Sequence, residues 1–404
     1  MPETDGDPPG LTVGGTQALI NLEDRHTSGA YPKRPLAIVR GEGIWLWDAE
    51  GRRYMDMTSG QGVALLGHSH PAILETVRRQ AELLITCPEI FYNDRRSELY
   101  ASLSQYTPED LNRFFLCNSG TEAVEGALKF ARLKTGRPGI VAAKSGFHGR
   151  TFGALSATWN PSHRRGFGPL LPEVSHIPFN DLRAVDAAID ASTAAVILEV
   201  VQGEGGVVPA KGEFLELVRR LCEQRGALLI FDEVQTGLGR TGRRFAAEHF
   251  SVTPDVICVG KGLAGGLPIG AVIWRDSLGK WPQGSHGSTL GGNPLACAAA
   301  TATLSLLDSG LLEHVAQVGE KFLADLRELE HPMIREVRGL GLMIGIDLRR
   351  RVTPVLKALM ERGVLALPAG PTVLRLLPPL VVTEEQLIEV FDAMLEALEV
   401  LEDE

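Results

Sequence analysis

The 404-residue chain lacks the sequence features that mark secreted, membrane-spanning and nucleic-acid-binding proteins. Its five cysteines stand far apart and form no C-x-x-C pair, which predicts reduced thiols in a cytoplasmic protein rather than a disulfide framework. The sequence has no run of about 18 apolar residues, so it predicts no membrane span. The net charge of −10 disfavours a nucleic-acid partner, because binding to phosphate backbones requires clustered lysine and arginine.

The sequence also gives little support for a metal site or a targeting segment. His68 and His70 are close together, but no third metal ligand stands at a recognisable spacing. A loop before a helix that starts at Pro71 is the simpler explanation, and no metal is expected. The opening residues, MPETDGDPPG, are acidic and lack the apolar segment of a secretory signal. We expect residues 1–25 to form a disordered or extended tail.

What the chain does contain is an alternation of short apolar runs with helical periodicity. Residues 36–58 predict a small meander of short strands. From about residue 114 to 275, apolar runs alternate with amphipathic helices, which predicts a mainly parallel sheet covered on both faces. The expected strands are Phe114–Cys117, Ile140–Ala143, Ala195–Val200, Ala227–Phe231, Val256–Val259 and Ile269–Trp274.

We therefore expect an α/β protein with a large and a small domain. The large domain would comprise residues 71–308 and end in a long Ala/Leu-rich helix over 294–307. Residues 309–404 would form the smaller α+β domain, which residues 26–70 would join. The elements expected in the C-terminal part are helices over 311–329, 354–362 and 384–400 and a strand over 342–348.

Clusters of polar residues and glycines follow the expected strands of the large domain, at the edge of an open α/β sheet where ligands bind. In the first, Asn118–Ala123, small residues open a helix whose free N–H groups can bind phosphate. A plain N-cap formed by Ser119 or Thr121 explains this cluster equally well. In the second, Phe147 can cover a planar ring and Arg150 can bind a carboxylate. Taken alone, an ordinary turn is the simpler explanation of that pair.

Three further clusters carry charge at strand ends. The acids of Glu199–Gly206 stand among glycines and can hold and release an arginine, although a surface glycine loop is the simpler explanation in isolation. Asp232 can keep a pyridine nitrogen protonated. Lys261 ends an apolar strand, where partial desolvation lowers the pKa of a lysine and makes it a nucleophilic amine. A lysine that extends to the surface explains Lys261 alone, but not all the clusters at once.

One motif points to a different class of enzyme. Gly237–Gly242 matches G-x-G-x-x-G, the dinucleotide fingerprint, which makes a nicotinamide-dependent oxidoreductase an alternative. Acidic Asp232 and Glu233 stand between the strand and the first glycine and would repel a pyrophosphate, so this alternative is disfavoured. Lys261 does not belong to a P-loop, because Gly262 follows it where serine or threonine is required. A catalytically silent scaffold is the non-enzyme alternative.

The order of the motifs NSGTEA, FHGR, QGEGG, DEVQTGLGRTG, Lys261 and HGSTLGGNPLA resembles the class III, ornithine/acetylornithine-type aminotransferases. The resemblance extends from about residue 30 to 400. It implies the fold-type-I architecture of pyridoxal 5'-phosphate enzymes, with a mainly parallel sheet in the large domain and a smaller α+β domain. It also implies a homodimer with active sites at the subunit interface. Val200 departs from the family, which carries a proline after the residue matching Glu199.

The resemblance assigns roles in binding the cofactor. Lys261 would hold pyridoxal 5'-phosphate covalently and, once released, move a proton between substrate and cofactor. Asp232 would pair with the pyridine nitrogen, and Gln235 would contact the ring hydroxyl. The other cofactor contacts would be Ser119, Gly120 and Thr121 at the phosphate, Phe147, His148 and Val234 at the ring, and Thr289 of the partner subunit at the phosphate.

The resemblance also assigns substrate contacts. Arg150 and Arg375 would bind carboxylates, and Glu204 would pair with Arg375 when no carboxylate is present. Because an unpaired arginine in a dry site is costly, a movable Glu204 would let the enzyme accept substrates with and without a carboxylate beside the reacting carbon. Ser288 of the partner subunit and Tyr31 would also lie near the substrate.

Two sets of motifs limit the range of substrates that the resemblance implies. Residues 364–375 resemble enzymes of the α-aminoadipate route to lysine, whose substrate is blocked by an acidic amino-group carrier protein. FHGR and HGSTLGGNPLA fit acetylornithine enzymes equally well. We therefore expect transfer of the terminal amino group of an α-N-blocked diamino acid to 2-oxoglutarate, giving glutamate, or the reverse, in lysine and/or arginine biosynthesis. Ornithine or another ω-amino acid is the alternative within the family.

Overall fold

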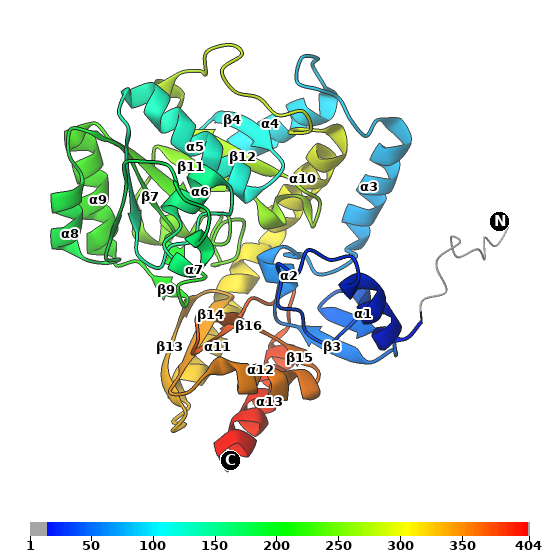
Figure 1. Ribbon diagram of the computed structural model, residues 1–404. Helices are drawn as coiled ribbons and strands as arrows, with labels where there is room; N and C mark the ends of the chain where they lie inside the picture. The colour runs from blue at the N-terminus through cyan, green and yellow to red at the C-terminus, as the bar shows by residue number, and fades with distance from the viewer. Residues whose placement is uncertain (1–13, 403–404) are drawn as a thin grey trace.

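The computed structural model describes residues 14–402 (Figure 1), and residues 1–13 of the expected tail lie outside this range. Within the described part, the expectation of an extended tail is wrong, because Thr16–Asp24 form helix α1. The backbone N–H and the hydroxyl of Thr16 both donate to the carboxylate of Glu50. These bonds dock the start of the helix on the turn that follows strand β2 (Trp45–Asp48).

The central sheet has seven strands in the order β4-β12-β11-β10-β7-β5-β6. Only β12 runs antiparallel to its neighbours, so the prediction of a mainly parallel sheet is confirmed. The sequence does not predict β6, a short edge strand whose residues Ser175 and His176 are polar. The strands are β4 (Arg113–Cys117), β5 (Gly139–Ala143), β6 (Val174–Ile177), β7 (Thr193–Leu198), β10 (Leu228–Asp232), β11 (Val256–Val259) and β12 (Gly270–Trp274).

Helices cover both faces of this sheet, and its pleat sends alternate side chains into separate cores. On β5, Ile140 and Ala142 pack with helices α5 and α6, whereas Val141 packs with α8 and α9 on the other face. Helices α4 and α10 cover β11 and β12 (Figure 1). The helices of this domain are α3 (Pro71–Leu83), α4 (Asp94–Tyr106), α5 (Gly120–Thr135), α6 (Phe152–Ala157), α7 (Pro161–Arg164), α8 (Leu182–Ala188), α9 (Gly212–Arg225) and α10 (Pro294–Leu306).

The C-terminal residues form an antiparallel sheet in the order β13-β14-β17-β16, which packs against three helices. The sequence does not predict β13, because its residues IREVRGL mix polar and apolar side chains without a clear period. The elements are β13 (Ile334–Leu340), β14 (Met343–Leu348), β16 (Leu367–Ala369), β17 (Val373–Leu376), α11 (Leu312–Glu328), α12 (Val352–Glu361) and α13 (Glu384–Glu402).

A further sheet joins the N-terminal segment to the C-terminal part of the chain. Its strands are β1 (Ile38–Glu42), β2, β3 (Arg53–Asp56) and β15 (Val364–Leu365), in that order. The pairing of β15 with β3 is parallel and brings residues far apart in the sequence side by side (Figure 1). A short α2 turn (Ser59–Gly62) follows β3 and leads back toward the large domain.

One stretch among the described residues, Pro294–Glu328, is long and apolar enough by length and composition to cross a membrane. It consists of α10 and α11, which meet at a bend over Leu307–Leu311 where Gly310 has a φ of +92°. The apolar side chains of α10 are buried in the core against α3 and α4. Burial within the protein therefore accounts for the apolar character of α10, the first part of this stretch.

A buried carboxylate fixes the loop that follows β10. Glu233 accepts hydrogen bonds from the hydroxyl of Thr236 and from the backbone N–H groups of Ala246 (3.1 Å) and Ala247 (2.9 Å). Glu233→Gln would place amide hydrogens against these donors. We expect the free energy of unfolding to fall by about 1–3 kcal/mol, measured by denaturant titration. A loss no larger than that of Glu216→Gln, an exposed site on α9, would contradict this prediction.

Candidate active site

Residues that follow β4, β5, β7, β10 and β11 surround a cavity of about 240 Å³. The clusters singled out in the sequence all contribute to it, because the carboxyl ends of parallel strands meet at one edge of a sheet. The lining residues are Gly120, Thr121, Phe147, His148, Gly149, Arg150, Glu199, Glu204, Asp232, Val234, Gln235 and Lys261.

The start of α5 forms an anion-binding wall of this cavity. Ser119 caps the helix, and its hydroxyl accepts a hydrogen bond from the backbone N–H of Glu122 (3.3 Å). The N–H groups of Gly120 and Thr121 have no acceptor within the helix, so they can bind a phosphate at the positive end of the helix dipole. A Cβ at Gly120 would lie 2.6 Å from Val234 Cγ1, so the loops approach closely only because residue 120 is glycine.

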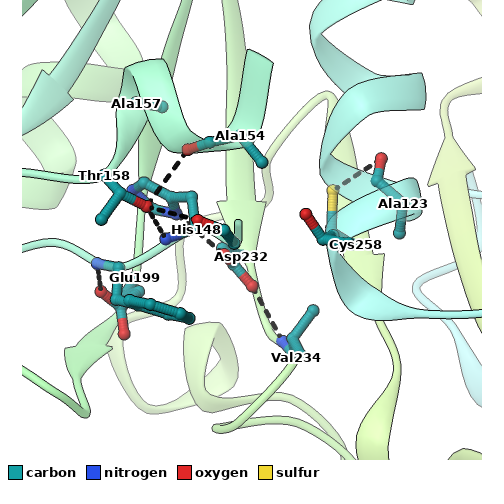
Figure 2. A network of polar contacts seen from close by, with 12 residues as sticks. Ala123, His148, Ala154, Ala157, Thr158, Glu199, Asp232, Val234 and Cys258 are labelled. Atoms are coloured by element: carbon teal, nitrogen blue, oxygen red, sulfur yellow. Dashed lines mark hydrogen bonds and ion pairs between the residues drawn. The ribbon is translucent and has the colours of Figure 1, made fainter. Parts of the chain in front are cut away.

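Asp232 and His148 form a buried pair at the back of the cavity (Figure 2). The carboxylate of Asp232 accepts hydrogen bonds from His148 Nδ1 (2.8 Å) and from the backbone N–H of Val234 (3.1 Å). Burial acts to lower the pKa of His148, but the hydrogen bond and charge of Asp232, with the charge of Glu199, outweigh it and raise that pKa. The pair thus presents a hydrogen-bonded carboxylate, the group that keeps a heteroaromatic ring nitrogen protonated.

Lys261 enters the cavity from a strained backbone position. It follows β11 with a φ of +45°, a conformation that non-glycine residues rarely adopt outside functional sites. Burial lowers the pKa of Lys261, and the nearby charge of Arg375 adds to this effect, while the charges of Asp232 and Glu204 oppose it. The neutral amine, which is the nucleophilic form, is therefore more accessible than in an exposed lysine.

This shift predicts a pH dependence for the reaction of Lys261 with aldehydes. In the apoenzyme, the rate of cofactor attachment should rise with pH and then level off. The pH at which the rate is half-maximal should lie below the ordinary lysine pKa of 10.5. A lowered pKa has this consequence because only the neutral amine reacts. The rate can be followed by the absorbance of the bound cofactor. A midpoint at or above the ordinary lysine value would contradict the prediction.

A buried arginine on β17 contacts two of the residues that line the cavity. Arg375 Nη1 lies 2.7 Å from Glu204 Oε1 and donates to Gln235 Oε1 at 3.2 Å. Arg375 is only 2% exposed, whereas the side chain of Glu204 is 40% exposed. Arg375 Nε is buried and has no hydrogen-bond partner among residues 14–402. A buried cation therefore has a counter-ion that can move into solvent and leave the guanidinium free for a carboxylate.

Phe147 and Arg150 lie together at the exposed side of the cavity. The Arg150 guanidinium lies 5.4 Å from the centre of the Phe147 ring. The edge of the His163 ring meets the same phenyl ring, at 5.9 Å between centres and 88° between planes. Arg150 is exposed and forms no ion pair within the described part of the chain. It is therefore available to bind a substrate carboxylate.

Five of the expected contacts do not line the cavity. Ser119 caps α5 at its edge, and Arg375 reaches it through the lining residues Glu204 and Gln235. The other three are Ser288, Thr289 and Tyr31. Ser288 accepts hydrogen bonds from Asn118 Nδ2 (3.1 Å) and from the backbone of Gly291 (3.0 Å), beside the phosphate wall. Thr289 is exposed and points to no group of the cavity among the described residues. Tyr31 is 76% exposed and lines a separate groove next to α1.

For two residues at or beside the cavity, the sequence predicted no role in the site. Glu199 was recognised only as part of an acidic glycine-rich loop, yet it lines the cavity and is 6% exposed. Burial raises the pKa of Glu199 to about 7. Gly62 of the α2 turn lies so close that a Cβ there would meet Lys261 Cδ at 3.8 Å. The run Ser59-Gly60-Gln61-Gly62 was the only signal for this contact, and Ser59 and Gln61 both have positive φ.

The glycine-rich motif that suggests a dinucleotide site has another use. A Cβ at Gly239 would lie 2.9 Å from Leu312 Cδ2, and one at Gly242 would lie 2.9 Å from Ala316 Cα. These glycines let the loop pack closely on α11, and Arg240 between them is fully buried. The motif therefore joins the two domains instead of opening toward a pyrophosphate.

The cavity fits pyridoxal 5'-phosphate on its own side-chain chemistry. The α5 N–H groups match a phosphate, Asp232 matches a ring nitrogen and Lys261 matches an aldehyde. Phe147 supplies an aromatic face. The chain thus has the architecture and the side-chain set of the fold-type-I pyridoxal-phosphate enzymes.

Comparisons with known proteins agree with this class and narrow it. The sequence profile of the family "Aminotransferase class-III" matches residues 28–398. The chain therefore belongs to the class III aminotransferases, and it is a pyridoxal-phosphate-dependent enzyme. The acetylornithine aminotransferase of Methanopyrus kandleri is 47% identical over 93% of this chain and 98% of its own length. The [LysW]-aminoadipate semialdehyde transaminase of Deinococcus radiodurans is 46% identical over 93% of this chain and 88% of its own length.

Solved structures give the same result for the fold. The ornithine aminotransferase of Toxoplasma gondii superimposes with a TM-score of 0.92 and 33% identity, covering 97% of both chains. The acetylornithine aminotransferase of Elizabethkingia anophelis gives a TM-score of 0.84 and 33% identity, covering 96% of this chain and 100% of that one. The predictions of the family, the fold type and the cofactor are therefore confirmed.

Proposed function

We propose that this enzyme transfers the terminal amino group of an α-N-blocked diamino acid to 2-oxoglutarate, or catalyses the reverse. The ion pair of Arg375 with the half-exposed Glu204 carries this proposal. One substrate, glutamate, has a carboxylate beside the reacting carbon, and the terminal amine of the other has none. The names of the relatives support a carrier-bound lysine precursor or N-acetylornithine as the blocked substrate, and hence a role in lysine or arginine biosynthesis.

The residues at the cavity have separate roles in this reaction. When bound, the cofactor supplies an electron-accepting ring next to the substrate carbon. Asp232, supported by His148, would keep the ring nitrogen charged, and the α5 N–H groups would hold the phosphate. Lys261, with its lowered pKa, is the amine that takes and returns the proton at the substrate carbon. Arg375 binds the α-carboxylate of glutamate once Glu204 has left.

The active form is proposed to be a homodimer in which Ser288 and Thr289 reach the site of the partner subunit. Apolar side chains between residues 83 and 92 are exposed, which a second copy could cover. Thr289 is exposed and lies outside the cavity of its own chain, as expected of a residue that serves a neighbouring site. The exposed apolar residues of this segment are Leu83, Leu84, Ile85, Ile90, Phe91 and Tyr92.

We place the enzyme in the cytoplasm, with glutamate, 2-oxoglutarate and an acidic amino-group carrier protein as its partners. Four of its five cysteines are buried and free, which suits a reducing compartment. Comparing turnover of N-acetylornithine with that of carrier-bound lysine tests the substrate directly. Turnover of free ornithine alone would overturn the proposal in favour of the ω-amino acid alternative.

Glu204→Ala is expected to favour glutamate over the blocked diamine. Arg375 would then lie uncovered, so glutamate would no longer have to displace an ion pair, and the diamine would react beside an unpaired cation. Because Glu204 is 40% exposed, we expect a modest effect of roughly five-fold in the ratio of kcat/KM values. Single-turnover measurements of both half-reactions give this ratio. Equal losses for both substrates would contradict the gate.

A further inference from the structure

A carboxylate to which the reaction assigns no role connects two loops of the site. Glu199 Oε1 accepts a hydrogen bond from the backbone N–H of Phe147 (2.8 Å), and Oε2 accepts one from the backbone N–H of Gly203 (3.0 Å). Figure 2 shows Glu199 near His148 and Asp232. One buried side chain therefore joins the ring-side loop, residues 146–150, to the gate loop, residues 203–206, which contains Glu204.

The gate loop is held on both sides of Glu204. Gly203 is fixed by Glu199, and the carbonyl of Gly206 accepts a hydrogen bond from Arg338 Nε (2.8 Å). A Cβ at Gly203 would lie 2.1 Å from Gln235 Oε1, the atom that also accepts a bond from Arg375. The backbone at Gly203 thus packs directly on the group that orients Arg375. With both ends fixed, the carboxylate of Glu204 can leave by side-chain rotation alone.

We propose that Glu199 is a positioning residue that holds the gate loop in place while Glu204 leaves and returns to Arg375, and that also holds Phe147 against the ring site. This inference rests on the proposed role of Glu204. A carboxylate suits the task because each of its oxygens can accept a backbone N–H, and such charge-assisted bonds are strong. Burial raises the pKa of Glu199 to about 7, while the charge of His148 and the two backbone N–H bonds favour the carboxylate and oppose this shift.

Glu199→Gln tests the inference, because its amide nitrogen cannot accept the second N–H. Loosening of the gate loop should weaken the pair of Glu204 with Arg375 and shift the ratio of kcat/KM values toward glutamate by about five-fold. Loss of the Phe147 tether should lower kcat for both substrates equally and raise the dissociation constant of pyridoxal 5'-phosphate from the apoenzyme.

A double-mutant cycle separates a gate effect from general damage. In the Glu204→Ala background, Glu199→Gln should change the substrate ratio by less than about two-fold, because no gate remains to be positioned. An equal shift in both backgrounds, or no shift in the wild-type background, would overturn the inference and leave the gate itself intact. If Glu204→Ala alone leaves the ratio unchanged, the gate is absent and both proposals fail.

Glu233→Gln is the matched control. Glu233 is also a buried carboxylate that accepts two backbone N–H bonds, but it does not line the cavity. The Glu233→Gln variant should have a lower unfolding midpoint and an unchanged ratio of kcat/KM values for the two substrates. A shift in that ratio equal to the one in Glu199→Gln would overturn the inference. If Glu199→Gln does not fold, Glu199→Asp serves in the same cycle, because the shorter carboxylate keeps its charge and reaches only one of the two donors.

Discussion

Lys261→Ala is expected to lower kcat by roughly 10³-fold or more for both substrates. The variant loses the amine that attaches the cofactor and the base that moves the proton at the substrate carbon. No other lysine lines the cavity formed by the described residues. The backbone of Lys261 has a φ of +45°, and in this conformation its side chain enters the site. Single-turnover absorbance changes with glutamate measure the loss directly.

Two controls make this result specific. Lys357→Ala removes an exposed lysine on α12 and should leave kcat unchanged. A small primary amine added to Lys261→Ala should restore part of the activity, since the space left by the side chain can hold a base. Borohydride reduction of the wild-type enzyme followed by peptide mass mapping should place the cofactor on Lys261. A reduced adduct on another residue would refute the assignment.

Asp232→Asn is expected to lower kcat by about 10²-fold or more, because a neutral amide cannot keep the ring nitrogen charged. The same change should lower the pKa of His148. The hydrogen bond and charge of Asp232 raise that pKa against burial, so removing the charge leaves burial with less opposition and favours the neutral imidazole. NMR titration of His148 measures this shift independently of activity.

Asp56→Asn is the control for this experiment, because the buried Asp56 pairs with a histidine at the same distance. Asp56 is fully buried and lies 2.8 Å from His68 Nε2, as Asp232 lies 2.8 Å from His148 Nδ1, but it does not line the cavity. It should reduce stability and leave kcat within a few-fold of wild type. Comparable losses of kcat in both variants would show that the effect of Asp232→Asn arises from damage to the fold.

The sequence predicted most of the large domain because its strands are short apolar runs with clear boundaries. Edge strand β6 and strand β13 were missed, since both mix polar and apolar residues without a clear period. Helix α1 was missed because it has no buried residues and its docking depends on Glu50, a contact distant in sequence. Local propensity gives no information on such contacts.

The candidate site was predictable where chemistry follows a strand end. Asp232 and Lys261 stand at the ends of the adjacent parallel strands β10 and β11. Gly120 follows β4, which runs in the same direction on the far side of the antiparallel β12, so all three ends converge at one edge of the sheet. Tyr31 was assigned by alignment alone, and the structure places it in a separate groove. Gly62 lies beside Lys261 in a turn with positive φ values, which a run of small residues only suggests.

The sequence by itself determined the parallel sheet, the phosphate-binding helix start and the strand-end lysine and aspartate, because each depends on a local run of residues. The family resemblance already suggested the pair of Glu204 with Arg375, but only the tertiary structure decided how that pair is held and that Glu199 joins the two loops beside it. The first contact joins the gate loop to β17 of another sheet, and the second joins loops that follow β5 and β7, so both depend on how separate elements pack. Side-chain hydrogen bonds act over about 3 Å, so a pattern along the chain cannot specify them.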